Sequence, residues 1–218
     1  MSVMSIHRAL SALKTTEKRF EKEKNAIFIS TTVGQTETCN GRSVKDVEVE
    51  IRANYDSVLS LLKNYEKLKL AIIRSNSGIT SKTEGVDFVQ MDDGEYLVAE
   101  IIAKQKFIIP MMQNLVDAWT RQLTMVNNEI ERANKRVSED ATTAITAMSG
   151  GDKNKITTEQ ANGFMEVYYK NNSMFAVDPL KLQEKVRKLK DDIDKFSIEA
   201  DSKLSEVNAL RTVEVNIQ

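Results

Sequence analysis

The chain has 218 residues, and its 31 basic and 32 acidic side chains give a net charge of −1, so it lacks the broad positive charge that attracts nucleic acid. Cys39 and His7 are the only residues of their types, which excludes an internal disulfide and thiolate metal clusters and leaves histidine chemistry to one side chain. Charged residues make up 29% and aromatic residues 6%, a balance that favours a helical protein over a thick enzyme core.

The start of the chain does not resemble a secretory leader. Residues 1–10 hold no apolar core of signal-peptide length. One of the longest apolar runs, residues 107–112, is far too short to span a bilayer. We therefore expect synthesis in the cytoplasm of a bacterial host without cleavage.

The first helix is predicted over residues 5–25, because apolar residues recur there every three or four positions. Residues 16–24 are dense in alternating charge, which is typical of a solvated helix face. The β-branched segment 26–33 predicts a short strand or a frayed helix end. A polar loop with Cys39 and the turn dipeptide Asn40-Gly41 follows.

The second helix is predicted over residues 43–76, with Ser43 and Asp46 at capping-box spacing. Gly78 should end it by taking a left-handed conformation. Residues 86–90 predict a short strand within the loop that follows.

The third and longest helix is predicted over residues 94–148, with a kink at Pro110. Residues 149–154 break it. The two apolar segments within residues 164–177 flank Lys170-Asn171-Asn172-Ser173, a pattern that predicts a β-hairpin with an asparagine turn.

The fourth helix is predicted over residues 179–210, with Asp178 as its N-cap and Pro179 at its first position. Its apolar residues keep one face for most of its length, and this seam must be buried against a helix of this chain or of a copy. Residues 212–217 alternate like a final strand. The seam consists of Leu182, Val186, Leu189, Ile193, Phe196, Ala200, Leu204 and Val207, and all of these except Ala200 form the predicted interface.

Several short motifs together carry a resemblance to a known family. They are Thr15-Thr16-Glu17-Lys18-Arg19-Phe20; Leu68 to Asn76 followed by Thr80; Asp93-Gly94 followed by Leu97; Leu182-Gln183-Glu184-Lys185; and Asn208 before Thr212-Val213-Glu214-Val215. In order and spacing the chain resembles the septicolysin-like proteins of bacteria and phages, with an insertion at residues 81–91. The resemblance implies a mainly helical coiled-coil protein that oligomerises and is often encoded among phage genes, and the family name implies a cytolysin.

The predicted fold is mainly α: one elongated domain over residues 1–218, built as an antiparallel long-helix coiled-coil bundle with a small β element. The expected partners are further copies of the chain and other virion structural proteins. We expect no cofactor, metal ion, small-molecule substrate, nucleic acid or membrane among them.

Two acidic clusters are the candidates for cation binding or hydrolysis. The helical cluster alternates with lysines off the seam, so a solvated helix face explains it better. The loop cluster lacks EF-hand spacing. The helical cluster is Asp191, Asp192 and Asp194, and the loop cluster is Asp87, Asp92, Asp93 and Glu95.

Other polar residues have simpler explanations. Cys39 is predicted to be an incidental surface cysteine, and His7 at a helix start is predicted to have no catalytic role. Arg74 and Asn76 either make a fixed contact at a subunit interface or satisfy the end of the second helix.

Three functions follow from these observations. The first is a non-enzymatic, self-associating structural protein of a phage or prophage head or tail. The second is a membrane-active, ring-forming cytolysin, for which residues 107–112 would have to enter lipid, although a helix core explains them better. The third, a hydrolase that uses the acidic clusters, has the least support.

Overall fold

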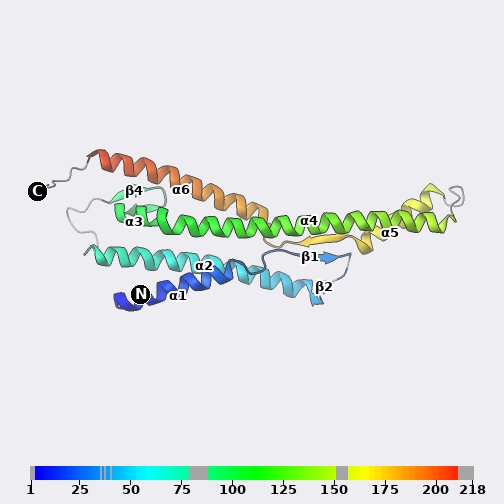
Figure 1. Cartoon of the computed structure of the whole chain (residues 1–218), viewed down its shortest axis with the longest axis horizontal. Helices are drawn as coiled ribbons and strands as arrows, with labels where there is room; N and C mark the ends of the chain where they lie inside the picture. The colour runs from blue at the N-terminus through cyan, green and yellow to red at the C-terminus, as the bar shows by residue number, and fades with distance from the viewer. Residues whose placement is uncertain are drawn as a thin grey trace, which may run out of the picture. The chain divides into compact units, whose positions relative to one another are not determined.

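The structure is a computed structural model that describes residues 3–34, 36, 38–39, 41–78, 88–150 and 157–210. It is mainly helical and carries small antiparallel sheets of two strands each (Figure 1). The α-helices are α1 (Ile6–Glu23), α2 (Val44–Asn76), α3 (Val98–Ala103), α4 (Ile109–Met148), α5 (Thr158–Asn172) and α6 (Leu182–Leu210). The π-helix η1 covers Lys104–Ile108, and the strands are β1 (Ser30–Val33), β2 (Thr38–Cys39), β3 (Arg42–Ser43), β4 (Val89–Met91), β5 (Gly94–Tyr96) and β6 (Met174–Val177).

The chain divides into two compact units. Unit 1 comprises Met1–Asn25, Asp56–Ala118 and Val186–Gln218, and unit 2 comprises Ala26–Tyr55 and Trp119–Lys185. The helices α2, α4 and α6 each contribute residues to both units. The prediction of a single domain over the whole chain stays a prediction.

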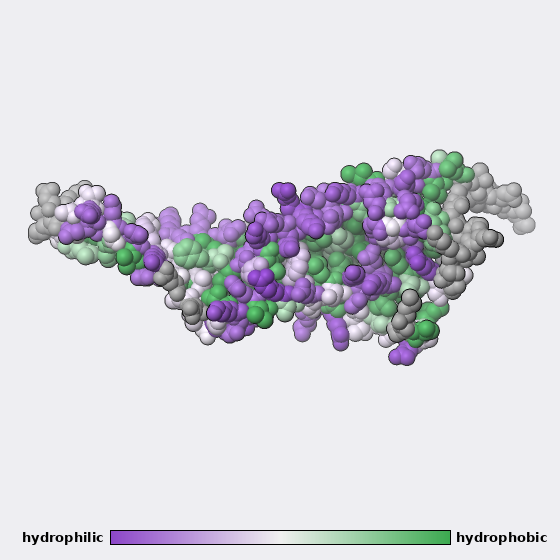
Figure 2. Space-filling view, turned by 180° about the vertical axis from the view of Figure 1, so that it is seen from behind, coloured by the Kyte–Doolittle hydropathy of each residue, from purple (hydrophilic) through white to green (hydrophobic). Residues whose placement is uncertain are grey.

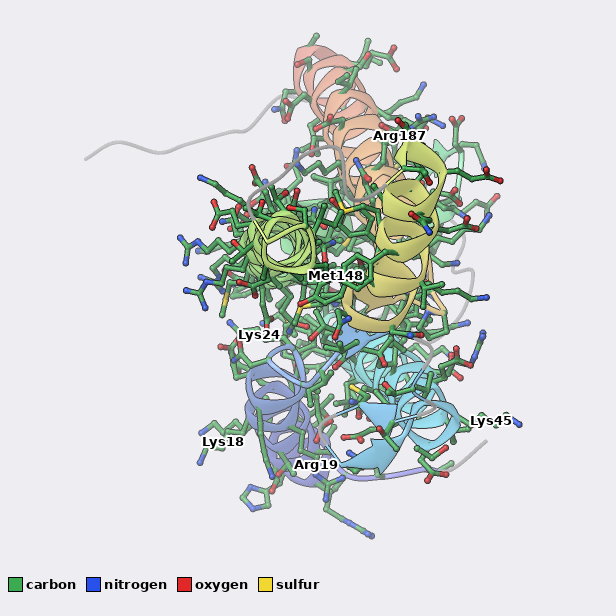
Figure 3. All side chains as sticks on the ribbon, turned by 90° about the vertical axis from the view of Figure 1, so that its right-hand side faces the viewer. Lys18, Arg19, Lys24, Lys45, Met148 and Arg187 are labelled. Atoms are coloured by element: carbon green, nitrogen blue, oxygen red, sulfur yellow. The ribbon has the colours of Figure 1, made fainter. Side chains whose placement is uncertain are left out.

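In unit 1, α1 runs along the C-terminal part of α2, and α6 runs along α3 and the first turns of α4 (Figure 1). A buried cluster of Val89, Met91, Ile101 and Ala200 joins the β4–β5 hairpin to α3 and α6. The charged side of α1 faces solvent, and Lys18 points outward from it (Figure 3). Apolar residues spaced by helical turns therefore hold unit 1 together.

The C-terminal seam faces the interior of its own chain. Its members Leu182, Val186, Ile193 and Ala200 are buried, and Leu189 is half-buried. The others pack in part against the cluster of unit 1 just described; they are Phe196, Leu204 and Val207. Whether the seam also contacts a second copy stays a prediction.

A π-helical turn interrupts the long helix where the sequence predicted a kink. The N–H of Ile109 bonds to the carbonyl of Lys104, one residue further back than in an α-helix. Pro110 follows directly, and its ring and missing N–H disfavour regular α-helical bonding to the turn before it. The widened turn is thus explained by Pro110.

Unit 2 is organised around β1 and β6, which pair antiparallel with Ser30 opposite Val177. The side-chain amide of Asn134 accepts a hydrogen bond from the N–H of Met174 at 2.7 Å and donates one to the Met174 carbonyl at 3.0 Å. Asn134 thus makes the pair of hydrogen bonds that a neighbouring strand would make. Trp119 is buried between Phe28, in an edge-on contact, and Tyr55, in a stacked one.

The β-hairpin predicted over residues 164–177 is wrong. Residues 158–172 form α5, which opens with a capping box between Thr157 and Gln160. Asn171 and Asn172 lie in the last turn of this helix instead of forming a hairpin turn. The strand β6 pairs instead with the distant β1, whose Thr31, Thr32 and Val33 are β-branched and favour strand structure.

Two predicted helix starts lie too early. The third helix begins at Val98 instead of residue 94, because Gly94–Tyr96 pairs with Val89–Met91 as β5. The fourth begins at Leu182 instead of residue 179. The carboxylate of Asp178 still accepts from the Leu182 N–H, but it does so across an intervening turn.

The remaining predictions concern the end of the second helix, the C-terminal segment and the possibility of a membrane span. The helix α2 ends at Asn76, and Gly78 has a φ of +69°, which is left-handed. The strand predicted over 212–217 lies outside the described residues. Within the part of the chain that is described, no helix is both long and apolar enough to cross a bilayer.

Candidate functional site

A buried lysine lies at the centre of a polar cluster in unit 1. Only 5% of Lys104 is exposed. Its ammonium donates to Asp93 Oδ2 at 2.6 Å and to the Tyr96 hydroxyl at 3.0 Å, and it lies 3.0 Å from Glu66 Oε1. It also lies 4.3 Å from the centre of the Tyr96 ring and 4.6 Å from that of Phe196. A buried charge is tolerated because acceptors and ring faces surround it.

Local structure explains how these groups meet. The π-helical turn presents Lys104, and the β4–β5 hairpin presents Asp93 and Tyr96 from its turn and its second strand. Glu66 comes from α2. The Tyr96 hydroxyl also donates to Asp93, at 3.0 Å, which fixes the carboxylate toward the lysine.

The electrostatics keep Lys104 charged. Burial by itself lowers the pKa of Lys104, but the hydrogen bonds that its ammonium donates to Asp93 and Tyr96, together with the nearby Glu66 carboxylate, outweigh burial, so the net pKa is raised. The pKa of Tyr96 is also raised, mainly by burial. A lysine nucleophile or base needs the opposite shift, so Lys104 is suited to an ionic lock or to fixed positive charge.

A second ion pair lies beside this cluster. Glu100 is fully buried and accepts from Arg74 at 2.6 and 3.2 Å and from the Leu97 N–H at 2.9 Å. The last contact caps the start of α3. The pKa of Arg74 is raised, mainly by its hydrogen bond to Glu100. Arg74 thus links α2 to α3. Neither role considered from the sequence, a contact at a subunit interface or the satisfaction of the end of the second helix, includes this ion pair.

A pocket of about 380 Å³ opens beside Lys104. Its lining combines apolar side chains, which we call the floor, with mostly acidic charged side chains, which we call the rim. Glu199 on the rim accepts from the Asp92 N–H at 2.7 Å, which fixes the hairpin turn to α6. The floor is Ile108, Ile109, Met112 and Phe196, and the rim is Glu66, Asp92, Asp93, Lys104, Asp192, Lys195 and Glu199.

The acidic clusters predicted from the sequence contribute in part. Asp93 belongs to the lysine network, and Asp92 and Asp192 line the pocket. Asp191 and Asp194 are exposed on α6, and Asp87 lies outside the described residues. Among the residues that the structure describes, no group of three or more His, Cys, Asp or Glu side chains could hold a metal ion.

The prediction that Cys39 is a surface cysteine is wrong. Cys39 is 2% exposed and packs with Val47, Ile51 and Val177 in unit 2. Its thiol donates to the Thr31 carbonyl at 2.9 Å. The loop sequence around it is polar, but the side chain fills the space beneath the β1–β6 sheet, so burial decides its environment. His7 is exposed at the start of α1.

Sequence reasoning missed Glu66, Tyr96, Glu100 and Lys104. A signal for Lys104 was present, since it occupies the helical spacing between Ile101 and Ile108 where the apolar stripe predicts another hydrophobic residue. A charged residue in an apolar stripe calls for a buried partner. Tertiary contacts decide which acidic residue becomes the partner of Lys104.

Comparison with known proteins adds no relative: no family model, no curated protein and no solved structure matches this chain. The resemblance to the septicolysin-like proteins therefore stays a prediction from the sequence.

Proposed function

We propose that this chain is a non-enzymatic, self-associating structural protein whose long helices pack as an antiparallel coiled-coil bundle. One observation carries the proposal. Large apolar side chains are exposed at the start of α1, and the described part of the chain does not cover them. Exposed apolar groups that gather in one place mark contact surfaces.

The exposed group is the first stretch of unit 1. Val3 is 99% exposed, and Met4, Ile6 and Leu10 are each between 41% and 44% exposed. Seen from behind, hydrophobic side chains reach the surface beside the start of α1 (Figure 2). We call the segment from Val3 to Leu10, which includes Arg8, the α1 tip. Such a surface gains free energy by being covered.

The reactive groups of the chain have structural roles that also support the proposal. Lys104 is held as a cation by Asp93 and Glu66. The Cys39 thiol is buried and bonded to a backbone carbonyl. These contacts account for both groups without a reaction.

The assignment to a phage or prophage particle rests on the sequence resemblance. The alternative of a ring-forming cytolysin relies on residues 107–112. In this segment Ile108, Ile109 and Met111 are buried, and the Phe107 ring is covered by the Lys69 ammonium at 3.6 Å. Because this segment packs in the core, it supports a structural protein over a cytolysin.

Sedimentation velocity over a dilution series of the purified chain tests the proposal. We expect the sedimentation coefficient to rise with concentration and to reach a plateau at a closed or growing assembly. A second sample with Cys39→Ser and His7→Gln should assemble equally. A concentration-independent monomer in the first sample would contradict the proposal.

A further inference from the structure

The α1 tip and the acidic pocket of unit 1 have opposite charge. Arg8 is exposed and lines one hollow together with Met4, and no acidic residue occurs between Val3 and Thr16. The pocket beside Lys104 is lined by five carboxylates and only two lysines. Its floor is apolar, as is most of the tip. The two surfaces are therefore complementary in both charge and polarity.

The pocket retains capacity for a cation. Lys104 already engages Asp93 and Glu66, and Glu199 is engaged by the hairpin backbone. The carboxylates of Asp92 and Asp192 make no contact recorded within the described part of the chain. An incoming guanidinium can bond to these two carboxylates, while its aliphatic stem packs against the apolar side chains of the same lining.

The pocket also has a suitable size. Its volume of about 380 Å³ lies at the lower end of the range for ligand pockets, roughly 300–1,000 Å³. Val3 is 99% exposed, and a hollow of about 590 Å³ lined by Val3, Met4 and Ile6 remains between α1 and α2. The residues that the structure describes therefore leave the tip incompletely packed.

We infer that the α1 tip of one copy docks in the acidic pocket of a second copy, with Arg8 between Asp92 and Asp192 and with Val3 and Met4 toward the apolar floor. This inference rests on the proposed self-association and names the surfaces that would carry it. Because the two surfaces are different, the contact is heterologous. Repeated contacts of this kind close into a ring or extend into a filament.

Charge reversal on each side tests the contact. Arg8→Glu reverses the tip, and a glutamate in the first turn is compatible with the helix dipole. Asp92→Lys with Asp192→Lys reverses the pocket. Lys18→Glu is the matched control, because Lys18 is an exposed lysine that points outward from α1 (Figure 3). Circular dichroism and Trp119 fluorescence establish that each variant is folded.

Sedimentation velocity at matched concentrations gives the result. We expect each reversal alone to weaken association by about tenfold or more, and Lys18→Glu to leave it unchanged. An equimolar mixture of the two reversed variants should recover assembly, because each reversed tip then meets a reversed pocket and each native tip meets a native pocket. If the double reversal does not fold, Asp192→Lys on the exposed side of α6 replaces it.

The failures are distinguishable. If the wild type assembles and either reversed variant assembles equally well, the docking surfaces are wrong but self-association stands. If both variants lose assembly and the mixture does not recover it, the pairing of tip with pocket is also wrong. A wild type that is monomeric at every concentration overturns this inference together with the proposed function.

Discussion

Replacing Arg74 by methionine should destabilise the chain far more than the loss of an ordinary surface arginine. Methionine keeps much of the aliphatic stem but removes the guanidinium that bonds both carboxylate oxygens of Glu100. Glu100 is fully buried, so its charge would be left with the Leu97 N–H as its remaining recorded donor.

The magnitude follows from burial. Removing one partner of a buried ion pair costs about 3–5 kcal/mol. The Arg74 side chain is 44% exposed, so solvent screens the pair from one side, and the Leu97 contact survives. We therefore expect Arg74→Met to lower the free energy of unfolding by about 2–3 kcal/mol.

Urea unfolding followed by circular dichroism measures this loss. The matched control is Arg42→Met, since Arg42 pairs with Glu50 where both side chains are exposed, and its loss should cost below about 1 kcal/mol. Adding Glu100→Gln to Arg74→Met should restore more than half of the loss, because the amide still accepts from Leu97 and leaves no buried charge. If Arg74→Met costs no more than Arg42→Met, the buried pair does not stabilise α2 against α3.

Three further predictions concern single positions. The pKa of Lys104 is raised in the folded chain because its hydrogen-bond acceptors outweigh the effect of burial. The free energy of unfolding should therefore be at its full value below pH 10.5, the ordinary pKa of lysine, and should fall as the pH rises above that value. Urea unfolding at a series of pH values should show a shallower fall for Lys104→Met. Gly34→Ala should lower the free energy of unfolding by about 2–3 kcal/mol in urea, because φ is +61° and a Cβ would overlap the Asn171 carbonyl oxygen, whereas Gly163→Ala, in an open helical position, should raise it by about 0.5–1 kcal/mol. Cys39 should react with an aromatic disulfide reagent only as fast as the chain opens, and a native rate equal to that in urea would contradict its burial.

The helical part of the fold was predictable because it depends on local periodicity. The apolar steps of three and four residues predicted the faces of α1, α2 and α6, and Pro110 indicated where the long helix is disturbed. Strand pairing was less accessible. The pairing of β1 with β6 joins segments that lie far apart in the chain, and the asparagines at positions 171 and 172 are compatible with a hairpin turn or a helix end.

The candidate site was less predictable than the fold. Asp92 and Asp93 were recognised as an acidic cluster, but their relation to Lys104 depends on the β4–β5 hairpin and on a π-helical turn. Cys39 shows the same limit, because the surrounding loop is polar while the side chain itself is buried. Tertiary contacts, which single-sequence patterns do not contain, decide both cases.

Amide hydrogen exchange of residues 3–16 at low and high protein concentration tests the central claim most directly. Exposed helix starts exchange through local opening, which docking against a second copy would suppress. The account predicts that exchange at the α1 tip slows as concentration rises, while exchange at Lys18 and beyond changes little. Exchange at the tip that is the same at both concentrations would contradict self-association through α1.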